Sequence, residues 1–515
     1  MPRAVWLGAI GAAVASGCYY RHSIGAYFWN DDFVWLYLLH DRPILEVLLT
    51  PLGGHTLVAR NLVFAALDRF AGLDAQPYFA TVLLTHAVNV VLLARIIWLL
   101  TDSAVIAALG ALAWGVCLTA SESLTWYSVY AQLAATGCVL LGMGRLAACR
   151  ANSGALLPGD LLVVGFWLVL GNLFFGTAMI VAITLPAVIV LLFPNILRGP
   201  HKGRLRLALV CAAATPAFVH VVLHWIASSV YSVPSIHGDS ILWLVHGVRA
   251  AGLSFVELLR VGVTSLFAGP WWHPSSETSP LGWVILSSAV ILCCGLLSKA
   301  KAATRTVCVA FAVPAVALYA SVALSRGPML VGLLHETPAQ VAATLRYHYS
   351  AQAFMAVTVC VALSTLPIRW RDACAYLAIV TLLVGVSVRP VPAQLLDLHS
   401  VTRNRVERAL SGVGDAIRAA PPGDTVVLQN HMIPHLGWMP NTTIALPGLA
   451  ALFVIAFPSN EVAGRIVRFE ERNQVVFEAF TARPSRLARV LVRPGGAAIE
   501  SDRDAVRERL DGPKR

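Results

Sequence analysis

Apolar runs long enough to cross a membrane recur along the first 392 residues, and they constrain the fold more than any other feature. A helix needs ~20 mainly apolar residues to cross the hydrocarbon core of a bilayer. Within lipid, backbone groups find partners only inside helices or closed barrels, and long Leu, Val and Ala runs favour helices over barrel strands. We therefore expect an all-α polytopic membrane module with eleven spans, near residues 4–20, 79–100, 104–121, 127–147, 160–175, 177–194, 206–228, 281–298, 304–324, 350–368 and 373–390.

The composition excludes an ordinary soluble protein and divides the chain in two. Hydrophobic residues make up 57% of the 515 residues and charged residues 13%, which is about half of the charged share of a soluble domain. Residues 393–515 alone hold 16 of the 38 Lys and Arg residues and 13 of the 27 Asp and Glu residues. We expect a transmembrane module at 1–392 and a soluble domain at 393–515 that ends in a charged tail. The net charge of +11 is scattered, so a nucleic-acid partner is not expected.

The C-terminal domain opens with an amphipathic stretch, Val391–Ala420. Strand-like runs follow at residues 425–429, 452–457 and 488–493, and Gly and Pro residues separate them. Short runs punctuated in this way predict a small α/β or α+β fold.

Basic residues in the short loops of the membrane module orient the chain. Lys and Arg are enriched in the cytoplasmic loops of membrane proteins. An N-terminus on the inside places most of these residues inside, and the reverse orientation would invert the rule. We therefore expect a multi-pass protein of the plasma membrane whose C-terminal domain lies outside the cytoplasm, together with the loops 21–78, 229–280 and 325–349.

Residues 240–268, within the second outer loop, are apolar but carry more charge than the predicted spans. Ionisable side chains are costly inside a membrane. This stretch contains His246, Arg249, Glu257 and Arg260. We therefore expect an interfacial helix here instead of a further span.

Two adjacent acids form the sharpest local motif, Trp29-Asn30-Asp31-Asp32-Phe33, about ten residues after the first span. Neighbouring carboxylates near a medium of low dielectric constant raise each other's pKa, which suits one of them to act as a general base near neutral pH. The pair can also bind a divalent ion such as Mg or Mn. The alternative is an acidic loop or a helix N-cap without catalytic function.

Cations and a further acid stand at the predicted outer ends of other spans. Arg346 begins the motif Arg346-Tyr347-His348-Tyr349, and the planar fork of a guanidinium suits a phosphate group. The alternative for Arg346 is an interfacial side chain that reaches the lipid headgroups. Arg60 is a second candidate cation, on an amphipathic stretch at residues 56–70. Glu122 lies between two apolar runs, where an acid is exposed, paired or functional.

The order of these motifs resembles the GT-C glycosyltransferases, particularly their protein O-mannosyltransferase-like branch. The resemblance covers roughly residues 1–392. The first span is followed by the acid pair Asp31-Asp32, then by a His-x-x-x-x-Arg segment and a Tyr-to-His helix. A Glu-x-x-x-Trp step and an Arg-Tyr-x-Tyr motif complete the series. In this chain the later motifs are His55–Arg60, Tyr78–His86, Glu122–Trp126 and Arg346–Tyr349.

This resemblance implies an inverting hexosyl- or pentosyltransferase that works at the outer face of the membrane. The implied donor is a polyprenyl-phosphate sugar, and the acceptor is a glycan, a protein or a lipid. Asp31 would be the catalytic base, and Asp32 would orient the acceptor or help to bind a metal ion. Arg346 and Arg60 would hold the donor phosphate. Substrate contacts would come from Glu122, His55, Tyr347 and Tyr349.

The chain departs from the family pattern in two places. Tyr130 and Gln132 stand where the family usually has an Arg and an Asp, and residues 172–180 lack a usual Ser-Lys-Glu. Mannose as the donor sugar is therefore not indicated. Two other classes remain open, a membrane transporter or lipid-linked sugar flippase, and a non-catalytic membrane protein with an outer binding domain. Transporters often carry internal repeats and ionisable residues at mid-membrane, and we find no repeat in this chain.

Overall fold

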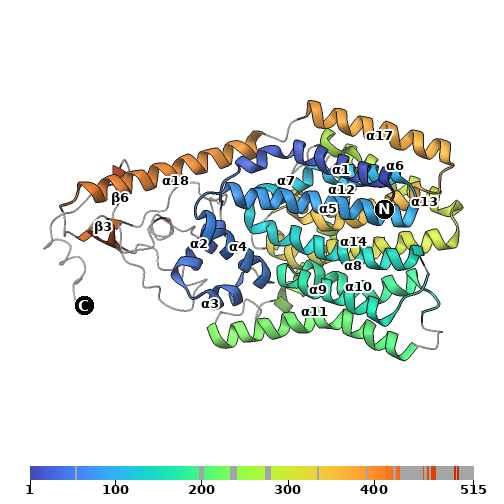
Figure 1. Cartoon of the computed structure of the whole chain (residues 1–515), viewed down its shortest axis with the longest axis horizontal. Helices are drawn as coiled ribbons and strands as arrows, with labels where there is room; N and C mark the ends of the chain where they lie inside the picture. The colour runs from blue at the N-terminus through green and yellow to red at the C-terminus, as the bar shows by residue number, and fades with distance from the viewer. Residues whose placement is uncertain are drawn as a thin grey trace.

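The structure is a computed structural model and describes the membrane module almost completely. The described residues are 1–29, 31–52, 55–152, 154–196, 202–231, 240–272, 280–332, 336–389, 393–421 and 425–429, with residue 456 and the short segments 461–462, 465–470, 492–493 and 496–497. Helices run side by side and form an elongated bundle (Figure 1). The bundle helices that match the eleven predicted spans are α1 (Arg3–Tyr19), α5 (Gln76–Thr101), α6 (Ala104–Gly115), α8 (Tyr130–Asn152), α9 (Pro158–Phe174), α10 (Thr177–Leu192), α11 (Lys202–Tyr231), α13 (Pro280–Lys299), α14 (Ala302–Gly332), α16 (Tyr349–Leu363) and α17 (Ile368–Val388).

Shorter elements connect these helices, and several lie at one end of the bundle. The further helices are α2 (Asp31–Asp41), α3 (Ile44–Leu49), α4 (Val58–Ala71), α7 (Ser121–Thr125), α12 (Ser240–Ala268), α15 (Pro338–Ala343) and α18 (Ala393–Ala419). Single 3-10 turns are η1 (Arg21–Gly25), η2 (Leu118–Ala120), η3 (Tyr127–Val129), η5 (Gly269–Trp271) and η6 (Leu345–His348). The strands β1 (Pro51–Leu52) and β2 (His55–Thr56) form a small antiparallel pair.

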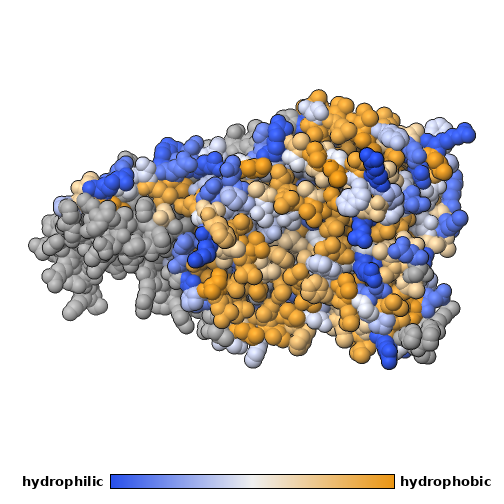
Figure 2. All heavy atoms as spheres, viewed as in Figure 1, coloured by the Kyte–Doolittle hydropathy of each residue, from blue (hydrophilic) through white to orange (hydrophobic). Residues whose placement is uncertain are grey.

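The bundle has the apolar character of a multi-pass membrane protein. Among the described residues, seven helices are long and apolar enough to cross a membrane, and the bent pair of α6 with residues 118–125 would make eight. Both α9 and α10 are apolar but shorter. Figure 2 shows hydrophobic residues over the middle of the bundle and hydrophilic residues gathered at its right-hand end and along α18. The count of eleven spans stays a prediction.

Small residues let the bundle helices approach closely, as is usual where lipid surrounds a protein. A Cβ added at Gly110 of α6 would lie 2.5 Å from Cys360 Sγ and from Ile97 Cδ1. A Cβ added at Gly171 of α9 would lie 2.9 Å from the Cβ of Ala178. These contacts bring α5, α6 and α16, and likewise α9 and α10, to distances that a larger residue would prevent.

A buried polar network holds five helices together. His86 of α5 contacts the Tyr349 hydroxyl at 2.8 Å and Ser16 Oγ of α1 at 2.9 Å. Ser16 also donates to the Gly115 carbonyl at the end of α6 at 2.6 Å. The Asn89 amide donates to the Leu133 carbonyl of α8 and to the Tyr349 hydroxyl. Since lipid offers no hydrogen-bond partners, these groups satisfy one another inside the bundle.

The first loop and the C-terminal helix lie at the same end of the bundle. In Figure 1, α2, α3, α4 and α18 are grouped at the left, and the N-terminus lies toward the right. His399 of α18 donates from Nδ1 to the Tyr27 carbonyl at 2.9 Å, and the Arg403 guanidinium lies 5.4 Å from the centre of the Tyr27 ring. We call this end of the bundle the α18 end. Its two parts face the same side of the membrane, as the predicted topology requires.

Two of the charged residues of α12 lie inside the protein. This helix packs against α13, α14, α15 and α16. Gly247 lies against Pro328, close to the α18 end of α14, and Gly262 lies against Tyr319 further along. Glu257 and Arg260 form an ion pair and are 9% and 0% exposed. Their pairing lets them be buried, and the interfacial placement of α12 stays a prediction.

The C-terminal domain is described in part. The predicted strand at 425–429 is present as β3 (Thr425–Gln429). It pairs in parallel with β5 (Arg465–Glu470), which pairs antiparallel with β4 (Glu461–Val462). A further antiparallel pair joins β6 (Val492–Arg493) and β7 (Gly496–Ala497). The predicted strand at 452–457 lies outside the described residues except for residue 456, and the small α/β or α+β domain stays a prediction.

The contact between His399 and Tyr27 predicts a pH dependence of stability. Burial lowers the pKa of His399 to about 4, against ~6.5 in an unfolded chain. Between these values the unfolded state binds a proton that the folded state does not, so stability falls as the pH drops from 6.5 toward 4, by at most about 2 kcal/mol at pH 5. Thermal unfolding at pH 7 and pH 5 measures this, and His399→Gln should show the smaller difference. Equal differences in both proteins would contradict the prediction.

Candidate functional site

Asp32 is the most constrained of the predicted site residues that the structure describes. It lies in the first turn of α2 at the α18 end, and it is fully buried. One carboxylate oxygen accepts from the Trp29 amide at 2.9 Å, and the other accepts from Ser128 Oγ at 2.6 Å. The first turn of a helix favours a negative charge. Part of the non-catalytic alternative therefore holds, because Asp32 does cap the start of α2.

Ser128 connects Asp32 to Arg60. The Arg60 Nη2 donates to Ser128 Oγ at 3.1 Å, and Nη1 donates to Asn61 Oδ1 at 3.0 Å. Arg60 is fully buried, and its guanidinium lies 4.6 Å from the ring centre of Trp35. Arg60 therefore does not lie on a solvated face of α4. Its contacts with Ser128 and Trp35 tie α4 to η3 and to α2.

Arg346 and Glu122 form the second half of the site. The Arg346 guanidinium pairs with a Glu122 carboxylate oxygen, and the Arg346 amide donates to the other oxygen at 3.1 Å. The guanidinium also lies 4.8 Å from the ring centre of Trp126 and 5.1 Å from that of Tyr347. These two charged side chains are 28% and 16% exposed. Arg346 is thus oriented by a carboxylate and two rings, yet it remains within reach of solvent or a ligand.

Two tryptophans join the halves into one cluster. The ring centres of Trp29 and Trp126 are 5.1 Å apart. Trp29 shares a hydrogen bond with Asp32, and Trp126 contacts Arg346. Segments far apart in the sequence thus meet at the α18 end, and we call this set the Asp32–Arg346 cluster. Its members are Trp29, Asp32, Trp35, Arg60, Glu122, Trp126, Tyr127, Ser128, Arg346 and Tyr347.

Several buried donors of this cluster have no hydrogen-bond partner in the described part of the chain. They are the indole N–H groups of Trp29, Trp35 and Trp126 and the hydroxyl of Tyr127. Buried polar atoms in native proteins are nearly always hydrogen-bonded. Four such donors within one cluster are hydrogen-bonding capacity that the described residues leave unused.

Other predicted site residues lie outside this cluster or cannot be compared with it. Asp31 begins α2 next to Asp32, and His55 lies in β2, but their side chains are outside the described part. Tyr349 is buried, and its hydroxyl belongs to the network with His86 and Asn89. Tyr349 therefore fixes the helices behind the cluster, whereas Tyr347 contacts Arg346.

Two residues near the cluster were not predicted from the sequence. Ser128 has no distinguishing pattern, because a serine after an aromatic pair is common in any loop. Glu336 precedes α15. Desolvation raises the pKa of its carboxyl above the usual value, and the nearby positive charge of Arg346 opposes part of this rise. A second acid is therefore close enough to Arg346 to feel its charge.

Metal binding stays a prediction. No group of three or more His, Cys, Asp or Glu side chains suited to a metal ion occurs among the described residues. The proposed ligands, Asp31 and Asp32, are a pair, and the Asp31 side chain is not among those described. The carboxylate of Asp32 already has two hydrogen-bond donors.

The comparisons with known proteins give a distant structural likeness. No protein-family model and no curated protein matches the chain. Among solved structures, it is similar to the Archaeoglobus fulgidus oligosaccharyltransferase tethered with an acceptor peptide containing the NVT sequon. That match has 12% sequence identity and a TM-score of 0.41, and it covers 76% of this chain and 55% of that chain. Likeness at this level assigns no function, and the function proposed below rests on this chain's own residues.

The ion pair between Glu122 and Arg346 predicts a graded loss of stability. Breaking a buried pair costs ~3–5 kcal/mol, and the partial exposure of this pair reduces the expected loss for Glu122→Ala to about 1–3 kcal/mol. Glu122→Gln should cost less, because its amide oxygen can still accept from the Arg346 amide. Thermal unfolding in detergent measures both. Asp415→Ala, which breaks the exposed pair with Arg418, is the matched control, and an equal loss there would contradict the prediction.

Proposed function

We propose that this protein is an integral membrane glycosyltransferase of the GT-C type, which transfers a sugar from a polyprenyl-phosphate donor to an acceptor at the outer membrane face. The observation that carries the proposal is the Asp32–Arg346 cluster. A buried acid, an ion-paired arginine and unpaired indole donors meet at the end of an apolar bundle. The order of motifs that resembles GT-C enzymes supports the same function.

The position of the cluster fits a lipid-linked donor. Such a donor keeps its tail in the bilayer and its phosphate at the interface. Arg346 lies at the start of α16, beside Trp126 and Tyr347. A guanidinium carries five N–H donors in a plane, so Arg346 can hold the Glu122 carboxylate and a phosphate together. Glu122 then orients the fork toward the donor.

The reaction we propose is a single inverting displacement. The acceptor hydroxyl oxygen forms a bond to the anomeric carbon of the sugar while the bond from that carbon to the phosphate oxygen breaks. The hydroxyl proton passes to the Asp31 carboxylate, and polyprenyl phosphate leaves with its negative charge held by Arg346. A leaving phosphate needs little help from an acid, so a single base suffices.

Asp32 has a positioning role in this mechanism. Its two oxygens accept from Trp29 and Ser128, which fixes the first turn of α2 and hence the backbone of Asp31. A divalent ion between the two carboxylates would add to this role. The donor sugar and the acceptor, whether glycan, protein or lipid, follow from neither the cluster nor its charges.

Transport or flipping of a lipid-linked sugar is the rival proposal. Transporters place ionisable residues and their substrate near the middle of the bilayer. The polar residues behind the cluster, His86, Asn89 and Tyr349, are bonded to one another. A transporter would move the donor without consuming it, so release of polyprenyl phosphate distinguishes the two.

Asp31→Asn should lower sugar transfer by ~10²–10⁴-fold, the usual loss when a general base is removed. The amide keeps the size of the side chain but cannot accept the proton. The measurement is transfer by the purified protein in lipid, with donor binding and thermal stability followed in parallel. Asp74→Asn, an exposed acid of the same loop that caps the next helix, is the matched control. Near-normal turnover of Asp31→Asn would remove the base from this position.

Arg346→Ala should weaken use of the lipid donor, and Arg346→Lys should restore it only in part, because Lys keeps the charge and loses the planar fork. The readout is the dependence of transfer on donor concentration. Arg389→Ala is the control, since Arg389 also stands at the α18 end of a span beside a ring, Trp271. If both Ala variants changed donor dependence equally, Arg346 would be an ordinary interfacial arginine.

A further inference from the structure

Arg260 of α12 is a second buried arginine, and the proposed reaction makes no use of it. Its side chain is fully buried, and Nε donates to Glu257 Oε2 at 2.6 Å. Neither Nη1 nor Nη2 has a hydrogen-bond partner among the described residues. A guanidinium that is buried with both terminal nitrogens unpaired is rare in native proteins, and it calls for an acceptor.

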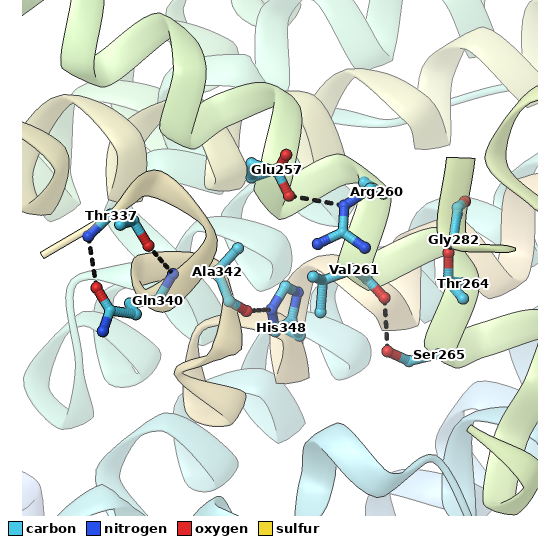
Figure 3. Close-up of polar contacts among 10 residues, drawn as sticks. All are labelled: Glu257, Arg260, Val261, Thr264, Ser265, Gly282, Thr337, Gln340, Ala342 and His348. Carbon is cyan, nitrogen blue, oxygen red and sulfur yellow. Dashed lines mark hydrogen bonds and ion pairs between the residues drawn. The ribbon is translucent and has the colours of Figure 1, made fainter. Parts of the chain in front are cut away.

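The surroundings of Arg260 hold the guanidinium in one orientation. Figure 3 shows its terminal nitrogens directed away from Glu257, toward the side where His348 and Thr264 lie. A Cβ at Gly282 would lie 2.7 Å from Nη1, so a glycine at the start of α13 makes room for the group. Thr264 Oγ1 donates to the Gly282 carbonyl at 3.1 Å and ties the two helices together.

The neighbouring ring does not replace the missing acceptor. The centre of the Trp283 ring lies 5.9 Å from the guanidinium carbon, near the limit of about 6 Å for a cation–π contact. A cation–π contact attracts the positive charge of Arg260. The ring does not accept hydrogen bonds from the terminal N–H groups, which lie in the plane of the guanidinium. The two terminal nitrogens therefore remain suited to a bidentate anion.

The place of Arg260 in the fold indicates where that anion comes from. The start of α13 faces outward into the apolar surroundings, with Leu281 57% and Val284 60% exposed. Gln352, in the first turns of α16, donates to the Gly262 carbonyl two residues after Arg260. Arg260 thus lies between the start of α13, whose outer side is apolar and exposed, and the first turns of α16.

We propose that Arg260, held by Glu257, binds the phosphate of a lipid headgroup at a site distinct from Arg346. The phosphate oxygens accept from Nη1 and Nη2, while Glu257 keeps Nε and sets the direction of the fork. Trp283, which is 37% exposed, covers the site on the lipid side and turns aside to admit the headgroup. This binding does not depend on sugar transfer.

The test measures binding of dihexanoyl phosphatidic acid to the full-length protein in detergent. An Arg346→Gln background removes the phosphate site proposed in the Asp32–Arg346 cluster. In this background we expect saturable binding, and the added change Arg260→Gln should raise the Kd at least about tenfold, the effect of losing a charge-assisted bidentate pair. Arg389→Gln in the same background is the control and should leave the Kd unchanged.

Glu257→Gln provides a variant with the opposite expectation. It keeps the acceptor for Nε and removes a negative charge beside the phosphate, so the Kd should fall. This variant also keeps the test decisive if Arg260→Gln does not fold. An unchanged or higher Kd for Glu257→Gln would overturn the proposal, as would binding that Arg260→Gln leaves unaltered.

Two further ligands identify the source of the phosphate. Dihexanoylglycerol, which lacks the phosphate, should not compete, and inorganic phosphate should compete only weakly because it has no acyl chains. Equal competition by inorganic phosphate would make this a site for the free anion and would overturn the lipid assignment. Because the readout is binding, failure of the transfer assay leaves the result intact.

Discussion

Lipid supplies no hydrogen-bond partner, so every polar side chain in the bundle must find its partner within the protein. The network around His86 satisfies this requirement by joining α1, α5, α6, α8 and α16. Tyr349, which accepts from it, stands three residues after Arg346. Because η6 and the start of α16 are continuous in the chain, the same bonds that hold the helices together also set where Arg346 stands. The position of Arg346 in the cluster thus depends on hydrogen bonds in which Arg346 itself takes no part.

Three arginines at the α18 end show three solutions to the cost of burying a charge. Arg60 lies between aromatic rings, and two of its partners among the described residues are neutral oxygens. Arg346 is partly exposed and pairs with Glu122. Arg260 is fully buried, pairs with Glu257 and keeps two unpaired nitrogens. A buried ion pair gains little net stability, because desolvation offsets the attraction between its charges. Two such pairs in one region therefore add little to the stability of the fold.

The sequence predicted the helices well and the cluster in part, for physical reasons that differ. Apolar runs identify spans because lipid demands them, and each of the eleven predicted runs corresponds to a helix. The outer-end motifs predicted that Asp32, Glu122, Trp126 and Arg346 would share one end of the bundle. The sequence did not identify Ser128, because its role depends on Asp32 and Arg60, which are distant in the chain and contact it only in the folded protein. The sequence also did not predict which way the Tyr349 side chain points, because a shift of one residue along a helix turns a side chain by ~100°.

The sequence of α12 carries a pattern that indicates burial of two of its charged residues. Glu257 and Arg260 are three residues apart, which places them on one face of a helix. Two opposite charges on one face of a helix can be buried as a pair, whereas the same number of scattered charges cannot. The spacing of Glu257 and Arg260 therefore indicates burial, whereas the number of charged residues alone indicates an interfacial helix.

The hydrogen bonds of Asp32 bear on which of the two adjacent acids is the better general base. A general base must be able to give up its existing partners and accept a proton during the reaction. Asp32 is fully buried, and its two carboxylate oxygens accept from a backbone amide and from Ser128. Protonating Asp32 would weaken both bonds and loosen the first turn of α2. The acid that anchors the helix is therefore the poorer base, which supports our proposal that Asp31 takes the proton.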